Sequence, residues 1–191
     1  MSSIFKYKKI NGEITITGLQ EGVAETAIEI PETIDNMPVT EIAEQAFLAS
    51  PITAVKIGKN VREIGELAFG ICKKLRSVTW NQKCDVIPSD CFSECPNLTK
   101  FDFSNVKKIE AHAFWDSGLT SVTLNKETEV GRSCFARCND LKKIEWLSDK
   151  SIEEDIFEGC KNIKEIIISD NVMDIAVDAF ASSPNAEITF V

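Results

Sequence analysis

The sequence has little of what catalytic and membrane-spanning proteins need. It contains one His and one Tyr in 191 residues, so a His-based metal centre or an acid–base relay has almost nothing to use. No stretch of 18 apolar residues occurs, which excludes a transmembrane helix and membrane insertion through one. Lys and Arg total 21 against 30 Asp and Glu, and the resulting net charge of −9 disfavours a nucleic-acid binder, which needs a basic surface.

Targeting signals and paired cysteines are also missing. The first nine residues carry charge but no apolar segment follows them, so they do not predict a signal peptide, and no surface anchor is visible. A cytoplasmic location is the default expectation, and a mature form whose signal has been removed is the alternative. The seven cysteines cannot all pair within one chain, which favours a reducing compartment or buried free thiols over a disulfide framework.

What the chain does contain is a repeat marked by phenylalanine. Seven of its eleven Phe residues recur at intervals of 21 to 23 residues. The residue before each Phe is small or apolar, the fifth residue before it is β-branched, and the third residue after it is Ser or Cys. The seven are Phe47, Phe69, Phe92, Phe114, Phe135, Phe157 and Phe180.

An apolar pattern of the form L-x-x-V-x-I follows each Ser or Cys, in six full copies from 52–57 to 163–168. Its last part alternates with period two, which predicts a short strand with one buried face. Because the strands recur too soon for a meander of long hairpins, we expect them to stack in parallel, about 4.8 Å apart. The rest of each copy would return as an extended piece and a helical turn that carries the Phe.

These features predict an α/β solenoid of about seven repeats, with parallel strands on its concave face and the Phe residues in its interior. We expect residues 1–191 to form a single domain. Asn11-Gly12 lies between two apolar runs, a strong β-hairpin signal, so residues 1–30 are expected to form an N-terminal cap. Residues 31–183 would then form the repeats, and residues 184–191 a terminal strand with an open edge.

The unit L-x-x-V-x-I, followed by apolar-x-x-I and A-F-x-x-C, resembles the BspA-like class of bacterial leucine-rich repeats over roughly residues 14–191. The segments 14–18, 28–31 and 37–42 are similar to the usual opening of that class. The resemblance implies a curved, right-handed leucine-rich-repeat solenoid without a catalytic motif. It also implies a surface or secreted protein that binds host matrix proteins or mediates adhesion.

The cysteines occupy regular interior slots of the repeat. One column holds Cys72, Cys95, Cys138 and Cys160, a second holds Cys91 and Cys134, and Cys84 takes a slot that Val fills in other copies. Zinc needs four ligands that converge on one point, whereas a column of stacked positions does not converge. We therefore expect buried thiols, with no metal site and no cofactor.

One row of the repeat has the residue types of a hydrolase triad. His112 lies two residues before Phe114, and the same slot holds Asp90 one repeat earlier and Ser133 one repeat later. Stacking would place the three about 5 Å apart. The column holds varied residues in the other copies and no oxyanion element accompanies it. We therefore expect a non-enzymatic protein and assign no catalytic residue.

The outward positions of the strands are the stronger candidate for a functional surface. Of the 24 such positions in the six full copies, six are basic and three acidic, so the face has a charge of +3 in an acidic protein. Large aromatic side chains are missing there, which gives no platform for carbohydrate stacking. The residues assigned to partner contact are Lys56, Arg76, Thr79, Lys100, Asp102, Thr123, Lys142, Lys143, Glu145 and Lys164.

Two functions follow as alternatives. The first is a protein-binding scaffold, in adhesion or another host or partner interaction, whose strand face engages a polar, extended or acidic partner. The second is a structural module that self-associates through the open C-terminal strand, near which Leu147 and Ile167 point outward. Charge reversal at Lys142 and Lys143 should weaken partner capture in the first case and leave assembly intact in the second.

Overall fold

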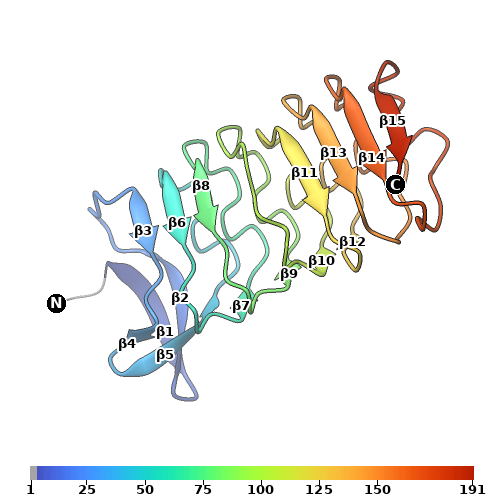
Figure 1. Cartoon of the computed structure of the whole chain (residues 1–191). Helices are drawn as coiled ribbons and strands as arrows, with labels where there is room; N and C mark the ends of the chain where they lie inside the picture. The colour runs from blue at the N-terminus through green and yellow to red at the C-terminus, as the bar shows by residue number, and fades with distance from the viewer. Residues whose placement is uncertain (1–3) are drawn as a thin grey trace.

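Each copy of the repeat forms one coil of a solenoid, and the coils stack along a single axis from the N-terminus to the C-terminus (Figure 1). The computed structural model describes residues 4–191. The regular secondary structure within that range consists of β-strands alone, and most of them are only two to four residues long. The predicted solenoid of stacked parallel strands is confirmed.

Two ladders of parallel strands run along the stack. The ladder that we call the strand face contains β3 (Ala27–Glu29), β6 (Ala54–Lys56), β8 (Ser77–Thr79), β11 (Ser121–Leu124), β13 (Lys143–Trp146), β14 (Glu165–Ile168) and β15 (Glu187–Phe190). The second ladder contains β2 (Glu13–Leu19), β5 (Met37–Ile42), β7 (Glu63–Ile64), β9 (Val86–Ile87), β10 (Lys108–Ile109) and β12 (Glu129–Val130). Equivalent repeat positions are sheet partners, as Val55 and Val78 show.

The seven repeated Phe rings form one column through the interior. Neighbouring ring centroids lie 5.3 to 5.7 Å apart, and the rings are within 24° of parallel. Six of these side chains are at most 1% exposed, and Phe180 at the C-terminal end is half-buried. The ring spacing follows from the distance between paired strands, which suits offset stacking of flat rings.

The turn that carries each Phe is not the helical turn that the sequence suggested. In the first copy, Phe47 N donates to Ala68 O of the next coil (2.9 Å), whereas Leu48 N closes back onto Gln45 O (3.1 Å). Gln45 and Ala49 have φ angles of 58° and 55°, which a right-handed helix does not allow. Alternate N–H groups therefore bind the neighbouring coil, and the expected α/β class is corrected to an all-strand solenoid in the described residues.

Where the slot after Phe holds Cys, its thiol ties the coil to the one before it. The Cys72 thiol donates to Phe47 O (3.1 Å). Equivalent bonds join Cys95 to Phe69, Cys138 to Phe114 and Cys160 to Phe135. All seven cysteines are free and buried, as predicted.

A β-hairpin covers the N-terminal end of the stack, as predicted. Strand β1 (Phe5–Ile10) pairs antiparallel with β2, and Asn11 and Gly12 form the turn between them with φ angles of 51° and 80°. Strand β2 also pairs in parallel with β5, so the hairpin joins the second ladder. Phe5 packs edge-on against Phe47 with ring centroids 6.3 Å apart, which extends the Phe column into the cap. A short strand, β4 (Thr33–Ile34), pairs antiparallel with β5.

The second ladder is interrupted between β7 and β9. Gly65 N and Glu110 N each donate to the preceding coil, at Ile42 O (2.8 Å) and Ile87 O (2.9 Å). The equivalent position in the copy between them is Pro88, which has no N–H to donate. Pro88 therefore removes one of the hydrogen bonds that would continue this ladder.

The strand face is interrupted at residues 99–103, where the repeat predicts a strand and the structure forms none. Phe101 and Phe103 occupy slots that mostly hold Val, Ile or Leu in other copies, and both rings pack on Phe114 at 5.2 and 5.3 Å. The break coincides with Phe101, whose slot holds Val or Ile in the other five full copies. No N–H of residues 100–103 has a hydrogen-bond partner within 4–191.

The C-terminal strand β15 pairs with β14 and leaves its other edge uncovered in the described chain. Its Ile188 and Phe190, which occupy slots that are buried in most other coils, are 49% and 53% exposed. Within residues 4–191 no helix has the length and apolar character to cross a bilayer.

Candidate functional site

The strand face carries three rows of side chains. Two of them flank the buried Val or Ile of each strand, because successive residues of a strand point to opposite sides, and the third lies one residue before the strand begins. The row that lies one residue before each strand, or at the equivalent position of the interrupted coil, contains Thr53, Arg76, Thr99, Thr120, Lys142 and Lys164. The next row holds Ala27, Ala54, Ser77, Lys100, Ser121, Lys143, Glu165 and Glu187. The row beyond the buried Val or Ile holds Glu29, Lys56, Thr79, Asp102, Thr123, Glu145, Ile167 and Thr189.

Three predicted contact residues lie together in one polar cluster. The Thr123 hydroxyl donates to Glu145 (2.8 Å), and Lys143 Nζ forms ion pairs with Glu145 and Glu165, both at 3.1 Å. The hydrogen bond from Thr123, with that from Lys143, holds the pKa of Glu145 below its usual value. The hydrogen bonds to Glu145 and Glu165 raise the pKa of Lys143. The positive charge of Lys143 is therefore neutralised within the cluster, which has a formal charge of −1 because it holds one cation and two carboxylates.

Lys56 is neutralised in a similar way. Its Nζ lies 2.6 Å from Glu29, the outward residue of β3.

The net charge of the strand face is also lower than the sequence count. That count covered the six full copies only, so it missed Glu29 and Glu187, which face outward on the first and last strands. These two carboxylates lower the positive surplus of the strand face from three to one.

Four predicted basic residues remain exposed and have no ion pair within residues 4–191. They are Arg76, Lys100, Lys142 and Lys164. Lys142 and Lys164 are neighbours, since Lys164 N donates to Lys142 O (2.9 Å). The strand face therefore offers one basic pair near β13 and β14 and two single basic residues.

A trough runs across the C-terminal ends of the strands from β3 to β13. It consists of three cavities of about 420, 210 and 330 Å³. The first and second cavities share Trp80 and Gln82 as lining residues, and the second and third share Asp102. Because neighbouring cavities share lining residues, they lie side by side, and we call the three together the trough.

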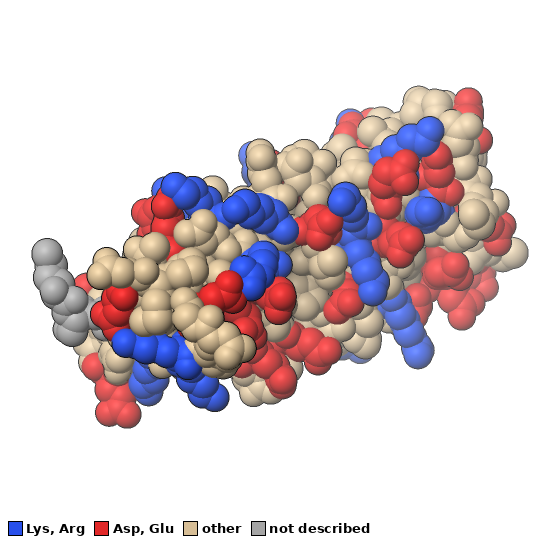
Figure 2. Space-filling view, turned by 90° about the horizontal axis from the view of Figure 1, so that it is seen from below, with Lys and Arg blue, Asp and Glu red and all other residues tan. Residues whose placement is uncertain are grey.

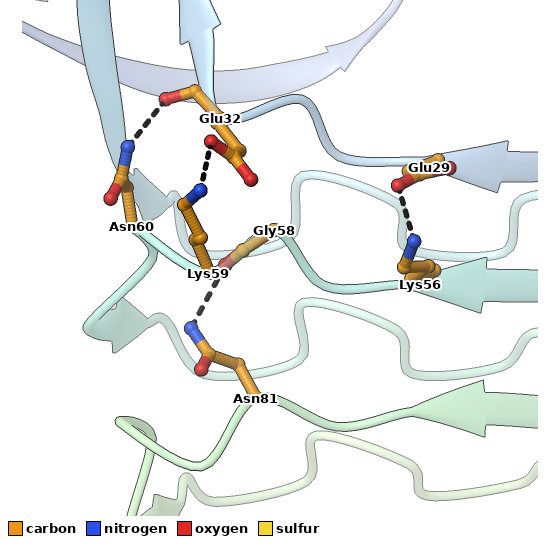
Figure 3. Close-up of polar contacts among 7 residues, drawn as sticks. All are labelled: Glu29, Glu32, Lys56, Gly58, Lys59, Asn60 and Asn81. Atoms are coloured by element: carbon orange, nitrogen blue, oxygen red, sulfur yellow. Dashed lines mark hydrogen bonds and ion pairs between the residues drawn. The ribbon is translucent and has the colours of Figure 1, made fainter.

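Several charged side chains line the first cavity, and four of them form ion pairs between neighbouring coils. Lys56 and Lys59 lie 2.6 Å from Glu29 and Glu32, respectively, on the neighbouring coil (Figure 3). Lys83, which also lines this cavity, is exposed and has no ion pair in the described chain.

The floor of the first cavity is held by a buried amide. Asn81 Nδ2 donates to Gly58 O (2.8 Å) and Val61 O (2.6 Å), and its Oδ1 accepts from Lys83 N (3.1 Å). Figure 3 shows the bond from Asn81 to Gly58 between successive coils. The amide satisfies backbone carbonyls at the bend that follows β6 and so holds the backbone that lines the first cavity.

The second and third cavities flank the interrupted coil at residues 99–103. Asp102 lines both, together with Thr79 in the second and Thr123 in the third. Ser104 N donates to Asp102 Oδ1 (3.0 Å), and this bond holds the pKa of Asp102 below its usual value. The third cavity is the most apolar, and its rim includes Leu147, which is 38% exposed.

The charged surface is mixed around the lower side of the solenoid. Figure 2 shows basic and acidic side chains intermingled there, with no broad area of one sign. Sequence reasoning placed Thr79, Asp102 and Thr123 on the outward face but missed Lys83 and the shape of the trough. The sequence signal for this part of the surface was the Asn that follows a strand in two copies. Asn81 and Asn125 both donate to backbone carbonyls of the preceding coil.

The row around His112 is not assembled into a catalytic relay. Ser133 donates to Asp155 Oδ2 (3.2 Å) rather than to His112, and within the described chain the His112 side chain has no hydrogen bond. Asp90, His112 and Ser133 all have left-handed φ angles, between 51° and 57°, in the turns that carry Phe. Burial raises the pKa of the Asp90 carboxyl. In residues 4–191 no three His, Cys, Asp or Glu side chains converge as metal ligands.

A stack of parallel-strand coils with an interior Phe column and a polar outward face defines a leucine-rich-repeat solenoid. The chain belongs to the family described as BspA type leucine rich repeat region, which it matches in six copies over residues 24–142 and 128–191. No curated protein matches the chain.

Solved structures show the same fold. A leucine-rich repeat protein from Bacteroides ovatus is 24% identical with a TM-score of 0.78, over 98% of this chain and 54% of that one. The T. pallidum leucine rich repeat protein is 26% identical with a TM-score of 0.81, over 96% of this chain and 88% of that one. The pneumococcal vaccine antigen PcpA is 19% identical with a TM-score of 0.57, and this chain spans about half of it (49%).

Proposed function

We propose that the chain is a non-enzymatic scaffold whose strand face binds a protein partner at the cell surface or outside the cell, as in adhesion. The observation that carries this proposal is the group of exposed, unpaired basic residues on the strand face, above all the neighbours Lys142 and Lys164. Unpaired charges on an open rigid surface steer and orient an oppositely charged partner. Membership of a leucine-rich-repeat family supports a binding role.

Reversing both charges, in K142E/K164E, should weaken partner capture at least about tenfold, because two favourable charge contacts become repulsive. The measurement is a quantitative pull-down from host and self extracts, followed by titration of each enriched protein. The matched control is K6E/K8E, which reverses two exposed lysines of β1 that also lack ion pairs in the described chain. Equal capture by both variants and the unmodified chain would contradict the proposal.

A second candidate function is self-association through the edge of β15, favoured by the exposure of Ile188 and Phe190. The same variants distinguish the two candidates. Sedimentation velocity at rising protein concentration should show a constant mass if the strand face is the functional surface. Concentration-dependent assembly that K142E/K164E leaves intact would instead support self-association.

A further inference from the structure

The trough suggests which kind of partner segment the protein takes. Its three cavities reach across six successive coil positions from β3 to β13. Five steps of about 4.8 Å give a length of roughly 24 Å, which about seven residues of extended polypeptide would span at 3.3 Å per residue. The dimensions match a short linear peptide that lies across the strand ends.

The charges of the trough differ from one cavity to the next. In the first cavity Lys56 and Lys59 are neutralised by carboxylates, so Lys83 supplies the free positive charge. In the second cavity Asp102 supplies a free negative charge, since Ser104 N binds only one of its oxygens and no cation contacts it among residues 4–191. The third cavity, with Phe101 and Leu147, supplies an apolar surface.

The interrupted coil adds unpaired backbone groups at the centre of the trough. Asp102 lines the second cavity and residues 101–103 line the third, and the N–H groups of these residues have no hydrogen-bond partner in the described chain. Backbone donors without a partner are satisfied by water or by a ligand. An extended peptide backbone offers carbonyl oxygens at regular intervals, which makes it a suitable acceptor.

We infer that the trough binds an extended peptide segment of about seven residues that carries a carboxylate, then a cationic side chain, then an apolar side chain. The inference rests on the proposed binding function and names its partner class. The carboxylate would meet Lys83, the cation would meet Asp102, and the apolar side chain would cover Leu147. A nucleic acid fits poorly, because its regular phosphates would face Asp102, Glu29 and Glu32.

The test is selection of a random heptapeptide phage library on the full chain, followed by fluorescence anisotropy of the enriched peptides. We expect an enriched pattern of acidic, basic and apolar residues, each separated by one or two positions. K83E, D102K and L147S should each weaken binding by about five- to tenfold or more, as expected for loss of one contact. Asp140→Lys, which replaces an exposed and unpaired carboxylate outside the trough, should leave binding unchanged.

A charge-swap experiment separates a direct contact from a change in shape. A selected peptide whose cationic residue is replaced by Glu should bind D102K better than it binds the unmodified chain. The inference is overturned if no peptide pattern is enriched, or if K83E, D102K and L147S bind the selected peptides as tightly as the unmodified chain. Partner capture that depends on Lys142 and Lys164 but not on these three residues would overturn it while the proposed function stands.

Discussion

Replacing Phe114 with Ala should lower the free energy of unfolding by about 3–5 kcal/mol, the usual cost of removing a fully buried Phe. The ring is 0% exposed and lies at the middle of the Phe column, 5.4 Å from Phe92 and 5.7 Å from Phe135. Phe101 and Phe103 also pack on it. Removing the Phe114 ring would therefore leave an interior cavity that extends between neighbouring coils as well as within one coil.

Urea denaturation followed by circular dichroism measures this effect. Because each coil contacts only its neighbours, the loss should also make the unfolding transition less cooperative. Phe190→Ala is the matched control, since this ring is 53% exposed on β15 and should cost less than about 1 kcal/mol. A loss below about 1 kcal/mol for Phe114→Ala would contradict the role of the Phe column as the core.

Raising the pH from 9 to 10 should lower the free energy of unfolding by about 4 kcal/mol through three buried thiols. Burial raises the pKa of Cys72, Cys84 and Cys95 to about 12. In the unfolded chain a thiol ionises near its ordinary value of about 8.5. Stability from these thiols is therefore complete below that value and is lost as the pH rises toward 12, at about 1.4 kcal/mol per thiol and pH unit.

The measurement is a series of urea melts between pH 8 and 10. The control is the variant C72S/C84A/C95S, whose stability should fall less steeply over the same range because it lacks the three thiols. Its Ser residues can keep the hydrogen bonds to Phe47 O and Phe69 O. Equal pH slopes for the two proteins, or rapid alkylation of these cysteines in the folded protein, would show that the thiols are not buried as described.

The sequence predicts the solenoid well because each coil repeats the same residue types at the same distance. Stacking then turns a sequence interval into a spatial column, which is why Phe69 lies over Phe92 and Cys95 bonds to the Phe69 carbonyl. The hairpin follows from Asn11-Gly12, since both residues tolerate a positive φ.

The Phe-bearing turn is not predicted correctly because its residues do not favour its geometry. Leu67 and Ile71 adopt φ angles of 55° and 59°, which their side chains disfavour. Only the bonds between coils, such as Phe69 N to Cys91 O (3.1 Å), make this conformation favourable. A right-handed helical turn is the better choice for one copy taken alone, and it is wrong for the stack.

The break at residues 99–103 cannot be predicted from the apolar pattern. Phe101 and Phe103 satisfy L-x-x-V-x-I as well as Val and Ile do, so the pattern predicts a strand. Pro88 is different, because a proline has no N–H and the loss of its hydrogen bond can be predicted from the sequence. For the candidate site, the sequence places outward residues correctly but does not show which charges pair, as Lys56 with Glu29 illustrates.

Amide hydrogen exchange, followed residue by residue by NMR, tests most directly whether the stack is open at residues 99–103, beside the second and third cavities of the trough. The amides of Phe92 and Phe114, which bind the next coil at 2.8 and 2.9 Å, should exchange at rates near those of global unfolding. The amides of Phe101 and Asp102 should exchange at least about 100-fold faster, because no hydrogen bond protects them. Protection of Phe101 and Asp102 equal to that of Phe92 and Phe114 would contradict an open coil and the binding site inferred from it.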